Sequence, residues 1–376
     1  MKNPQRIACF FSTSGHSGVD RAMQHLIPSL AGRGYEVDLL HIERHGPYLQ
    51  EIPERVRVVE LGTRSTYPSL FPLIRYLRRT RPAVLLADKD RVNRTAMLAK
   101  FLSRTDPWLV LSSGTTISID LAHRGGFERW LQRTSMGRLY PYANQIIVTS
   151  KGVADDMAAY TGLARERIRV VPSPVIPDDA FTRSYPRPEH PWFQPDQPPV
   201  ILGVGELGMR KDFPTLIRAF ARLRRERPCR LVILGKGKQK GELESLAQSL
   251  GVAEDMDLVG FKPNPYDYMA HAGLFAFTSL WEGLGFVLIE ALALGVPVVS
   301  VDCPSGPSEI LQQGRYGRLV AVGDDAALSA AMLATLGTPL PREVLQQAAR
   351  PYSISAATDA YLQAFGLPPR CVRTPT

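Results

Sequence analysis

Short apolar runs alternate with longer segments of helical periodicity along the first half of the chain. Apolar runs of strand length are typical of buried strands, and apolar residues spaced three and four apart are typical of helices. The pattern predicts strands at residues 6–11, 36–42, 83–87, 109–112 and 145–149, and helices at 20–32 and 70–79. Strands that alternate with helices form parallel sheets whose faces the helices cover.

The second half repeats this alternation after a change of composition. Nine prolines stand from Pro172 to Pro199, which is typical of a connector because proline disrupts both helices and sheets. Beyond them the pattern predicts strands at 200–204, 230–234, 256–259, 274–278 and 296–301, helices at 213–225, 242–250 and 286–294, and a last amphipathic helix at 355–365.

These elements predict an α/β fold of two Rossmann-like domains that face each other across a cleft. We expect an N-terminal domain at 1–172, a proline-rich linker at 173–199 and a C-terminal domain at 200–350. The helix and tail at 351–376 are expected to cross back to the N-terminal domain. A length of 376 residues agrees with two domains. In such folds ligands bind at the carboxyl ends of the strands.

Composition is ordinary for a globular protein, with 44% hydrophobic and 22% charged residues. No apolar run approaches the ~18 residues of a membrane span. The N-terminal apolar stretch is too short for a signal peptide and predicts a buried strand. The four cysteines lie far apart, so neither a zinc site nor a disulfide framework is expected. These features favour the cytoplasm.

Positive charge is concentrated in the N-terminal half. The formal net charge is +9: residues 1–185 contain 26 Lys and Arg against 17 Asp and Glu, whereas residues 186–376 contain 19 of each. A basic half is suited to nucleic acid, an anionic membrane surface or an acidic acceptor, and a solvated arginine-rich surface is the alternative. Residues 70–81 combine apolar positions at helical spacing with four arginines. One face of this helix is therefore a candidate for docking on anionic headgroups, unless it packs on the N-terminal sheet.

The most informative stretch is residues 281–300, which read WEGLGFVLIEALALGVPVVS. It follows a predicted strand, passes two glycines, opens a helix and returns to a strand at a Gly-x-Pro stop. A helix that begins after a glycine-rich turn has free backbone N–H groups, which favour phosphate. Glu282 lies before the helix and Glu290 more than a turn inside it. The two carboxylates are therefore expected to contact different parts of one extended ligand.

This stretch resembles the signature of glycosyltransferase family 4, a family of retaining enzymes with the GT-B fold that includes bacterial lipopolysaccharide and exopolysaccharide glycosyltransferases. The resemblance rests on the two glutamates eight residues apart, the Gly-x-Gly between them and the Ala-Leu-x-x-Gly-x-Pro-Val-Val that follows. It extends to Val204-Gly205, to the Lys-Asp-Phe that begins at Lys211 and to the Leu-Gly-x-Gly that ends at Gly237. The resemblance is close over about residues 200–325 and looser in the N-terminal half, where it includes the loop Gly15–Gly18.

The resemblance implies roles for single residues. Lys211 would neutralise the donor pyrophosphate, Glu290 would hold ribose hydroxyls, and Glu282 would contact hydroxyls of the transferred sugar. Further donor-binding positions are Gly205, Glu206, Gly283, Leu284, Gly285 and Phe286, with Gly15 and Gly18 from the other domain and Phe261 and Lys262 in the base-recognition loop. Glu282, Lys211 and Arg210 are the expected catalytic residues.

The chain departs from the family pattern at two places. The family commonly has a second cation five residues before Lys211, where this chain has Glu206, and Arg210 is expected to supply the missing charge. The family often has a His after the strand at 109–112, where this chain has Ser113-Gly114-Thr115-Thr116. His123 is either a substitute or a structural residue.

A polar cluster follows the predicted strand at 83–87. Asp88 ends that strand and is expected to point toward the ligand-binding edge of the sheet. With Lys89, Arg91 and Asn93 it is suited to a hydroxyl-rich or anionic acceptor, and Thr115 is expected to join this acceptor site. A surface loop is the alternative, and a metal site at the D-x-D pair of Asp88 and Asp90 is another.

Three other patterns indicate other functions only weakly. Residues 203–208 match the dinucleotide-binding G-x-G-x-x-G, but the next strand ends without the acidic residue that binds ribose. The D-x-D pair of Asp255 and Asp257 adjoins a strand and is expected in a turn. Residues 302–310 either present N–H groups to the donor or form a proline-shaped loop, and Cys303 has no base motif beside it.

The sequence therefore predicts a retaining glycosyltransferase that moves a sugar from a nucleoside-diphosphate sugar to a glycan or lipid-linked acceptor, in cell-surface polysaccharide or lipopolysaccharide biosynthesis. A sugar-nucleotide-binding protein or an epimerase of the same architecture is the alternative. The nucleotide sugar is a substrate, and no metal or cofactor is expected. An anionic membrane surface is an expected partner and nucleic acid is not. The enzyme is expected in the cytoplasm, at the inner face of the cytoplasmic membrane.

Overall fold

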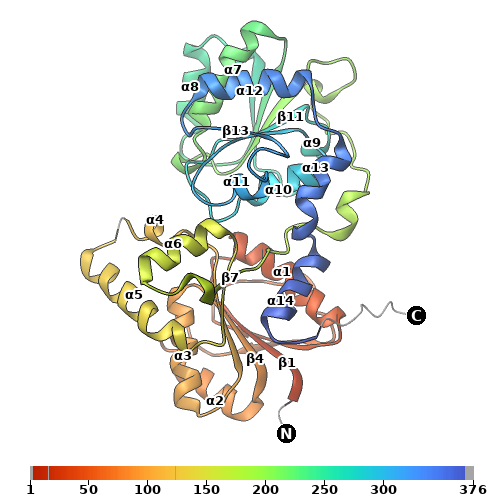
Figure 1. Cartoon of the computed structure of the whole chain (residues 1–376). Coiled ribbons are helices and arrows are strands. Elements are labelled where there is room, and N and C mark those ends of the chain that lie inside the picture. Colours follow the sequence, from red (N-terminus) through yellow and green to blue (C-terminus); the bar gives the residue numbers. More distant parts are fainter. Residues whose placement is uncertain (1–2, 16, 123, 369–376) are drawn as a thin grey trace. The chain divides into compact units, whose positions relative to one another are not determined.

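The computed structural model describes residues 3–15, 17–122 and 124–368, which form two compact units (Figure 1). Unit 1 extends to Val175 and also includes the segment that begins at Tyr352, and unit 2 is Ile176–Pro351. Residues 176–199, which we expected within a linker, belong to unit 2.

Unit 1 contains a seven-stranded sheet in the order β3-β2-β1-β4-β5-β6-β7, and every strand pair is parallel. The strands are β1 (Asn3–Phe10), β2 (Glu36–His41), β3 (Val56–Glu60), β4 (Pro82–Asp88), β5 (Trp108–Ser113), β6 (Gln145–Val148) and β7 (Ile168–Val170). Its helices are α1 (Gly18–Gly32), α2 (Leu70–Thr80), α3 (Asp90–Ser103), α4 (Ile117–Asp120), α5 (Gly126–Leu139), α6 (Lys151–Thr161) and α14 (Ile354–Ala364).

Unit 2 contains a six-stranded sheet in the order β10-β9-β8-β11-β12-β13, again with parallel pairs throughout. The strands are β8 (Val200–Val204), β9 (Arg230–Leu234), β10 (Met256–Gly260), β11 (Leu274–Phe277), β12 (Val298–Val301) and β13 (Arg318–Val320). Its helices are α7 (Phe213–Glu226), α8 (Lys240–Ser249), α9 (Tyr266–Ala270), α10 (Phe286–Ala293), α11 (Pro307–Ile310), α12 (Asp325–Gly337) and α13 (Arg342–Ala349).

Both sheets reverse their strand order at one point, which fixes where ligands can bind. In unit 1 the chain proceeds outward from β1 to β2 and from β4 to β5, and in unit 2 from β8 to β9 and from β11 to β12. At such switch points the loops after two neighbouring strands diverge and leave room at the carboxyl edge. The loops after β1 and β4 and the loops after β8 and β11 are therefore the places to search for a site.

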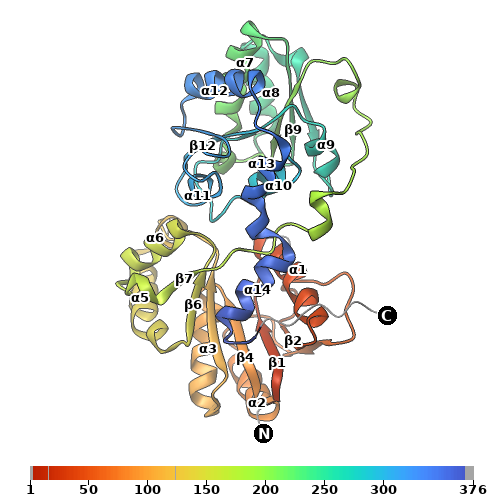
Figure 2. The ribbon, with the colours of Figure 1, turned by 45° about the vertical axis from the view of Figure 1, so that its right-hand side comes forward.

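The C-terminal helix α14 is part of unit 1. It packs against α1, and the two helices lie side by side in both ribbon views (Figures 1 and 2). Thr358 Oγ1 donates to Ser29 Oγ at 2.8 Å, and the buried guanidinium of Arg33 pairs with Asp359. Polar contacts, in addition to apolar packing, thus hold α14 on α1.

The proline-rich segment packs on unit 2 through aromatic side chains. Phe193 contacts Tyr268 with ring centroids 5.3 Å apart, and His190 Nε2 lies 3.1 Å from Asp257 Oδ2. Gln346 Nε2 donates to the Phe181 carbonyl oxygen at 2.8 Å. These contacts explain why a stretch without long helices or strands is nevertheless ordered against this unit.

Helix α2 does not present its apolar face to solvent. Leu73 and Leu77 are fully buried and belong to the same core cluster as Phe10, with Leu70 and Ile74 packed against that cluster. Of the two alternatives for this face, the structure shows the second: it packs in the core of unit 1 against the sheet and α3, and is not available for docking on headgroups. Among the described helices, none has both the length and the apolar character needed to cross a membrane.

Candidate functional site

A buried carboxylate joins the two loops at the switch point of unit 2. Glu282, in the loop after β11, accepts from Lys211 Nζ at 2.7 Å through Oε1 and from Arg210 Nη1 at 2.6 Å through Oε2. Lys211 and Arg210 lie in a short 3₁₀ turn, Met209–Lys211, after β8. Ser279 Oγ donates to Glu282 Oε1 at 2.9 Å. The three residues expected to be catalytic thus lie in one contact cluster.

Backbone contacts hold the same two loops together. Thr278 Oγ1 donates to the Lys211 carbonyl oxygen at 2.7 Å, and the Leu280 N–H donates to the Arg210 carbonyl oxygen at 2.8 Å. The Lys211 ammonium also lies 5.2 Å from the centroid of the Phe277 ring. The positions of both cations are therefore fixed by β11 as well as by β8.

The charges around Glu282 decide its protonation. Burial by itself raises the pKa of this carboxyl, but the nearby charges of Lys211 and Arg210 outweigh burial and hold the pKa below its ordinary value. Cys303 stands close by, and burial together with the Glu282 charge raises the pKa of its thiol to about 12. Glu282 is therefore ionised and Cys303 protonated at neutral pH, in agreement with the expectation that this cysteine is no nucleophile.

Two glycines are required by the packing of these loops. A Cβ at Gly205 would lie 2.6 Å from Cε of Lys211, so the lysine side chain crosses a position that only glycine leaves open. Gly285 has a φ of 96° and its Cβ would lie 3.2 Å from the Phe277 ring. A side chain at Gly285 would strain the backbone directly before α10.

Helix α10 begins at Phe286, directly after the loop of Glu282, Gly283, Leu284 and Gly285. Its first N–H groups have no partner earlier in the same helix, so the helix start offers donors to an anion. Glu290 is the fifth residue of α10 and is fully buried. It lies inside unit 2, and its predicted contact with ribose stays a prediction.

Three other predicted donor residues lie outside the Glu282 cluster. Glu206 is exposed, and no partner for its side chain is found in the part of the chain that the structure describes. Phe261 is also exposed, with Lys236 Nζ 5.6 Å from its ring centroid. Lys262 Nζ lies 5.8 Å from the Tyr268 ring centroid. The last two follow β10, which β9 and β8 separate from β11 in the sheet.

The predicted glycine loop of unit 1 surrounds a buried acid. Ser17 caps α1, and Asp20 Oδ2 accepts from the Ser17 N–H at 2.7 Å and from its hydroxyl at 2.5 Å. Gly18 is the first residue of α1, and Gly15, with a φ of 85°, packs on the Tyr48 ring. A carboxylate therefore already stands at this helix start, and the predicted phosphate contact of Gly15 and Gly18 remains untested.

A cavity of about 510 Å³ opens at the carboxyl edge of the sheet in unit 1. Four of the five predicted acceptor residues line it: Asp88, Lys89, Arg91 and Thr115. Its lining also contains residues from the loops after β1 and β2, from the start of α3, from the end of β5 and from either side of α5: Ser12, His45, Asp90, Ser113, Arg124 and Tyr140.

Asp88 is the most perturbed acid of this cavity. It is 3% exposed, and among the described residues its Oδ2 has no hydrogen-bond partner. Burial raises the pKa of Asp88 to about 6, although a hydrogen bond with Ser112 and the charge of Lys89 act in the opposite direction. Asp88 thus lines the cavity as a buried acid whose protonated and ionised forms are both accessible near neutral pH.

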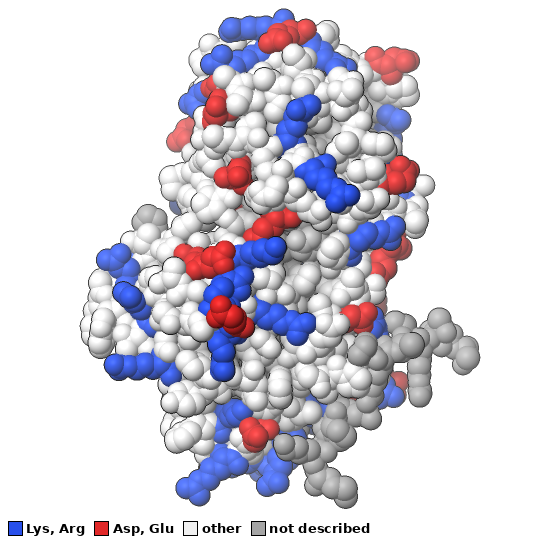
Figure 3. All heavy atoms as spheres, in the orientation of Figure 1, with Lys and Arg blue, Asp and Glu red and all other residues white. Residues whose placement is uncertain are grey.

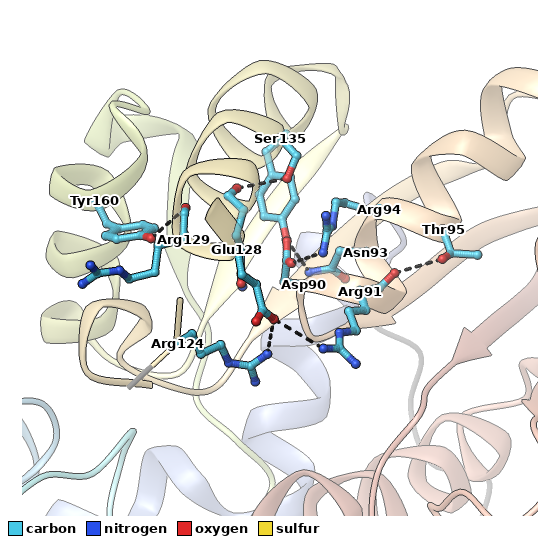
Figure 4. A network of polar contacts seen from close by, with 12 residues as sticks. Asp90, Arg91, Asn93, Arg94, Thr95, Arg124, Glu128, Arg129, Ser135 and Tyr160 are labelled. Atoms are coloured by element: carbon cyan, nitrogen blue, oxygen red, sulfur yellow. Dashed lines mark hydrogen bonds and ion pairs between the residues drawn. The ribbon is translucent and has the colours of Figure 1, made fainter. Parts of the chain in front are cut away.

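Asn93 does not reach the cavity. Its side chain is fully buried, and Nδ2 donates to the Ser112 carbonyl oxygen at 2.9 Å and to the Tyr140 hydroxyl at 3.1 Å. In Figure 4 it lies with Asp90 and Arg94, which form an ion pair of 2.7 Å. The structure gives Asn93 a positioning role between β5 and α3, in place of the acceptor contact expected for it.

A second ion network lies at the cavity rim. Glu128 Oε1 lies 2.5 Å from Arg124 Nη1 and 3.4 Å from Arg91 Nη2, so one carboxylate lies between two guanidinium groups (Figure 4). These two guanidinium groups lower the pKa of Glu128. Both arginines line the cavity, and Glu128 partly neutralises them in the absence of ligand.

Sequence reasoning missed His45 and Arg124. His45 follows β2, and its Nδ1 lies 3.1 Å from Ser12 Oγ. The family resemblance predicts a histidine only after β5, although every loop at the carboxyl edge of the sheet can contribute a side chain to a ligand site. His123 falls outside the described residues. The signal for His45 was its place just after a predicted strand.

The rival patterns have structural partners. Asp255 pairs with Arg224 at 2.8 Å and also with Arg230, and Asp257 contacts His190. Across the described residues no group of three or more His, Cys, Asp or Glu side chains is arranged to hold a metal ion. The α11 helix after residues 302–306 is only four residues long.

Two family models match the chain and together span both units. The model described as glycosyl transferase 4-like domain matches residues 17–174, and the model described as glycosyl transferases group 1 matches residues 188–351. The chain belongs to the glycosyltransferases. The predicted family and enzyme class are thereby confirmed.

One curated relative is similar to this chain over most of the length of both proteins. The N-acetylgalactosamine-N,N'-diacetylbacillosaminyl-diphospho-undecaprenol 4-alpha-N-acetylgalactosaminyltransferase of Campylobacter jejuni is 29% identical over 343 residues. The match covers 86% of this chain and 88% of that protein.

Solved structures show the same fold. The lipopolysaccharide outer core galactosyltransferase WaaB has a TM-score of 0.76 at 18% identity, and Anabaena HepE, in complex with UDP, has 0.77 at 16% identity. Each match covers 96% of this chain and 99% of the other. The glycosyltransferase therefore has the GT-B fold, as the sequence predicted.

The raised pKa of Asp88 predicts that the free energy of unfolding depends on pH. Its pKa is raised from 3.8 to about 6 on folding, so the native state binds a proton more tightly than the unfolded state does. Stability is therefore lost as pH rises from about 4 to about 6, by roughly 3 kcal/mol. We expect Asp88→Asn to raise the free energy of unfolding at pH 8 by up to this amount, with a much smaller gain at pH 4.

Urea unfolding at both pH values measures the effect. Asp120→Asn is the matched control, because Asp120 is an exposed carboxylate on the same cavity. A gain for Asp88→Asn that is equal at pH 4 and pH 8 would show that ionisation of Asp88 costs the native state nothing.

Proposed function

We propose that this glycosyltransferase moves a sugar, with retention of anomeric configuration, from a UDP-sugar to a lipid-linked glycan of cell-surface polysaccharide biosynthesis. The observation that carries the proposal is the pair of cations, Lys211 and Arg210, held on Glu282 at the switch point of unit 2. A nucleoside diphosphate needs cationic and N–H donors of this kind when it leaves.

The site chemistry supports each part of the reaction. The bond between the sugar C1 and the diphosphate oxygen breaks, and its electron pair leaves with the diphosphate. Lys211, Arg210 and the N–H groups at the start of α10 stabilise the charge that develops there. The acceptor oxygen bonds to C1, and its proton passes to the diphosphate oxygen that leaves C1. Glu282 would contact a hydroxyl of the donor sugar while it keeps both cations in position.

The choice of substrates rests on relatives and on charge. HepE is in complex with UDP, and the Campylobacter relative is named for an acceptor linked through a diphosphate to undecaprenol. The cavity of unit 1, with Lys89, Arg91 and Arg124 in its lining, is suited to a diphosphate-linked acceptor. Asp88 would accept a hydrogen bond from an acceptor hydroxyl. Such an acceptor requires the enzyme to work at a membrane surface.

Loss of either cation is expected to weaken nucleotide binding. A hydrogen bond to a charged group contributes about 1.5–3 kcal/mol, so Lys211→Ala and Arg210→Ala should each raise the Kd for UDP by about tenfold to a hundredfold. Glu282→Gln should keep or strengthen UDP binding, because both cations lose their internal counter-charge, and should slow transfer by at least about tenfold. Calorimetry with UDP and transfer assays measure both quantities.

Lys240→Ala removes an exposed lysine of the same unit and serves as the control. Unchanged UDP binding in both cation variants contradicts the donor site. Isomerisation of the UDP-sugar without an acceptor would instead indicate an epimerase, and binding without turnover a nucleotide-sugar-binding protein.

We expect transfer without a divalent metal, because two side-chain cations already face the expected position of the diphosphate. Activity should survive EDTA, and the product, analysed by NMR, should keep the anomeric configuration of the donor. Activity that EDTA abolishes and Mn²⁺ or Mg²⁺ restores would point to Asp88 and Asp90 as ligands.

The acceptor proposal predicts effects of opposite sign at the cavity rim. Arg91→Ala combined with Arg124→Ala should raise the KM for a diphosphate-linked acceptor by roughly tenfold, because two exposed cations are lost. Glu128→Gln frees both arginines and should lower that KM. Neither change should alter the Kd for UDP. Arg75→Ala, an exposed arginine of α2, is the control, and an equal effect of Arg75→Ala would reduce the result to net charge.

A further inference from the structure

Helix α5 presents an exposed apolar face. Phe127, Trp130 and Leu131 are spaced as neighbours on one side of the helix, and their exposed fractions are 75%, 59% and 42%. The rings of Phe127 and Trp130 stack with centroids 6.0 Å apart. Met136, on the opposite side, is the one buried residue of this helix. Alpha5 therefore differs from α2, whose apolar face is covered by the sheet.

Three arginines of α5 lack carboxylate partners among the described residues, and two of them, Arg133 and Arg138, lie beside this apolar face. Arg129, Arg133 and Arg138 are exposed, and within the described part of the chain none of them lies within ion-pair distance of a carboxylate. In Figure 4 the Arg129 guanidinium points away from the network of Arg91, Glu128 and Arg124. Arg133 and Arg138 line a hollow of about 430 Å³ beside Trp130. Figure 3 shows Lys and Arg atoms around an uncharged area on this flank of unit 1.

We propose that this face of α5 is the surface that docks the enzyme on an anionic lipid bilayer, an inference that rests on the proposed lipid-linked acceptor. Phe, Trp and Leu on one side of a helix enter the interface between headgroups and acyl chains, and flanking arginines pair with anionic headgroups. The three arginines without carboxylate partners add the electrostatic attraction that docking needs.

The other side of the same helix belongs to the acceptor cavity. Gln132 and Met136 line that cavity together with Arg124, which lies two residues before the start of α5. A bilayer on the outer face would therefore bring a lipid-linked glycan next to the cavity of the same unit. The docking surface thereby selects acceptors that are carried on a membrane.

The test is co-sedimentation of the full-length protein with vesicles of 30% phosphatidylglycerol in phosphatidylcholine, at roughly 0.05 M and 0.5 M salt. We expect wild type to bind these vesicles, to bind pure phosphatidylcholine weakly, and to dissociate at high salt. Phe127→Ser, Trp130→Ser and Leu131→Ser combined should lower vesicle binding at least about tenfold. Arg129→Gln, Arg133→Gln and Arg138→Gln combined should remove the preference for anionic lipid.

Controls separate docking from catalysis. Phe71→Ser removes an equally exposed aromatic of α2 and should leave vesicle binding unchanged. The serine variant should keep its Kd for UDP and its transfer to a detergent-solubilised acceptor, and those two assays judge the proposed function independently. Quenching of tryptophan fluorescence by brominated lipid should decrease when Trp130→Phe is introduced. Equal vesicle binding by wild type and the serine variant would overturn the proposal. A second result would also overturn it: wild type is a dimer by light scattering, the serine variant is a monomer, and both bind vesicles equally. The face would then join two copies of the chain.

Discussion

The ion cluster of Glu282 with Lys211 and Arg210 is the interaction on which the second unit's chemistry depends. A buried carboxylate is costly unless it is paired, and loss of one partner leaves a charge without compensation. Here the partners come from the loop after β8 and the carboxylate from the loop after β11, so the same contact that satisfies the charge also fixes two loops at the switch point. Gly205 has no side chain, so the Lys211 side chain can pass over its backbone. The positions of both cations are consequently fixed, which would lower the reorganisation needed for the proposed binding of a diphosphate.

Unit 1 shows the opposite outcome of the same physical balance. Asp88 is as deeply buried as Glu282, but its partners are a serine hydroxyl and one exposed lysine, and burial prevails in raising its pKa to about 6. Glu282 has two cations within hydrogen-bond distance, and there the charges prevail. Burial alone therefore does not separate the two acids; the number of close cations does. One carboxylate is held in its ionised form between two loops, and the other lines a cavity with a raised pKa.

The sequence predicted the central strands and the helix at α10 because these elements are apolar and continuous. It missed β3, β7 and β13, which are only partly buried and lack a clear apolar run. It named Glu282 and Lys211 as site residues through family resemblance but assigned them to different parts of the ligand. Their mutual contact spans 71 residues, and no local pattern encodes it. It also named α2 as a candidate for membrane docking, because periodicity shows that α2 has an apolar face and does not show what covers that face. Alpha5 has a single buried residue, so the same search passed over it.

The two halves of the chain differ in net charge and therefore in the range over which they attract anions. Residues 186–376 carry equal numbers of positive and negative side chains, so in the proposed donor site Lys211 and Arg210 would attract a diphosphate only at short range. Residues 1–185 carry the whole surplus of nine positive charges, and part of it lies on the exposed arginines of α5, which have no carboxylate partner among the described residues. A surplus of this kind acts over about a Debye length of 8–10 Å and is screened by salt. A small soluble donor needs only the first kind of attraction, since it diffuses freely to its site. An acceptor confined to a surface favours the second, because the enzyme must be drawn to that surface before the cavity can select a ligand.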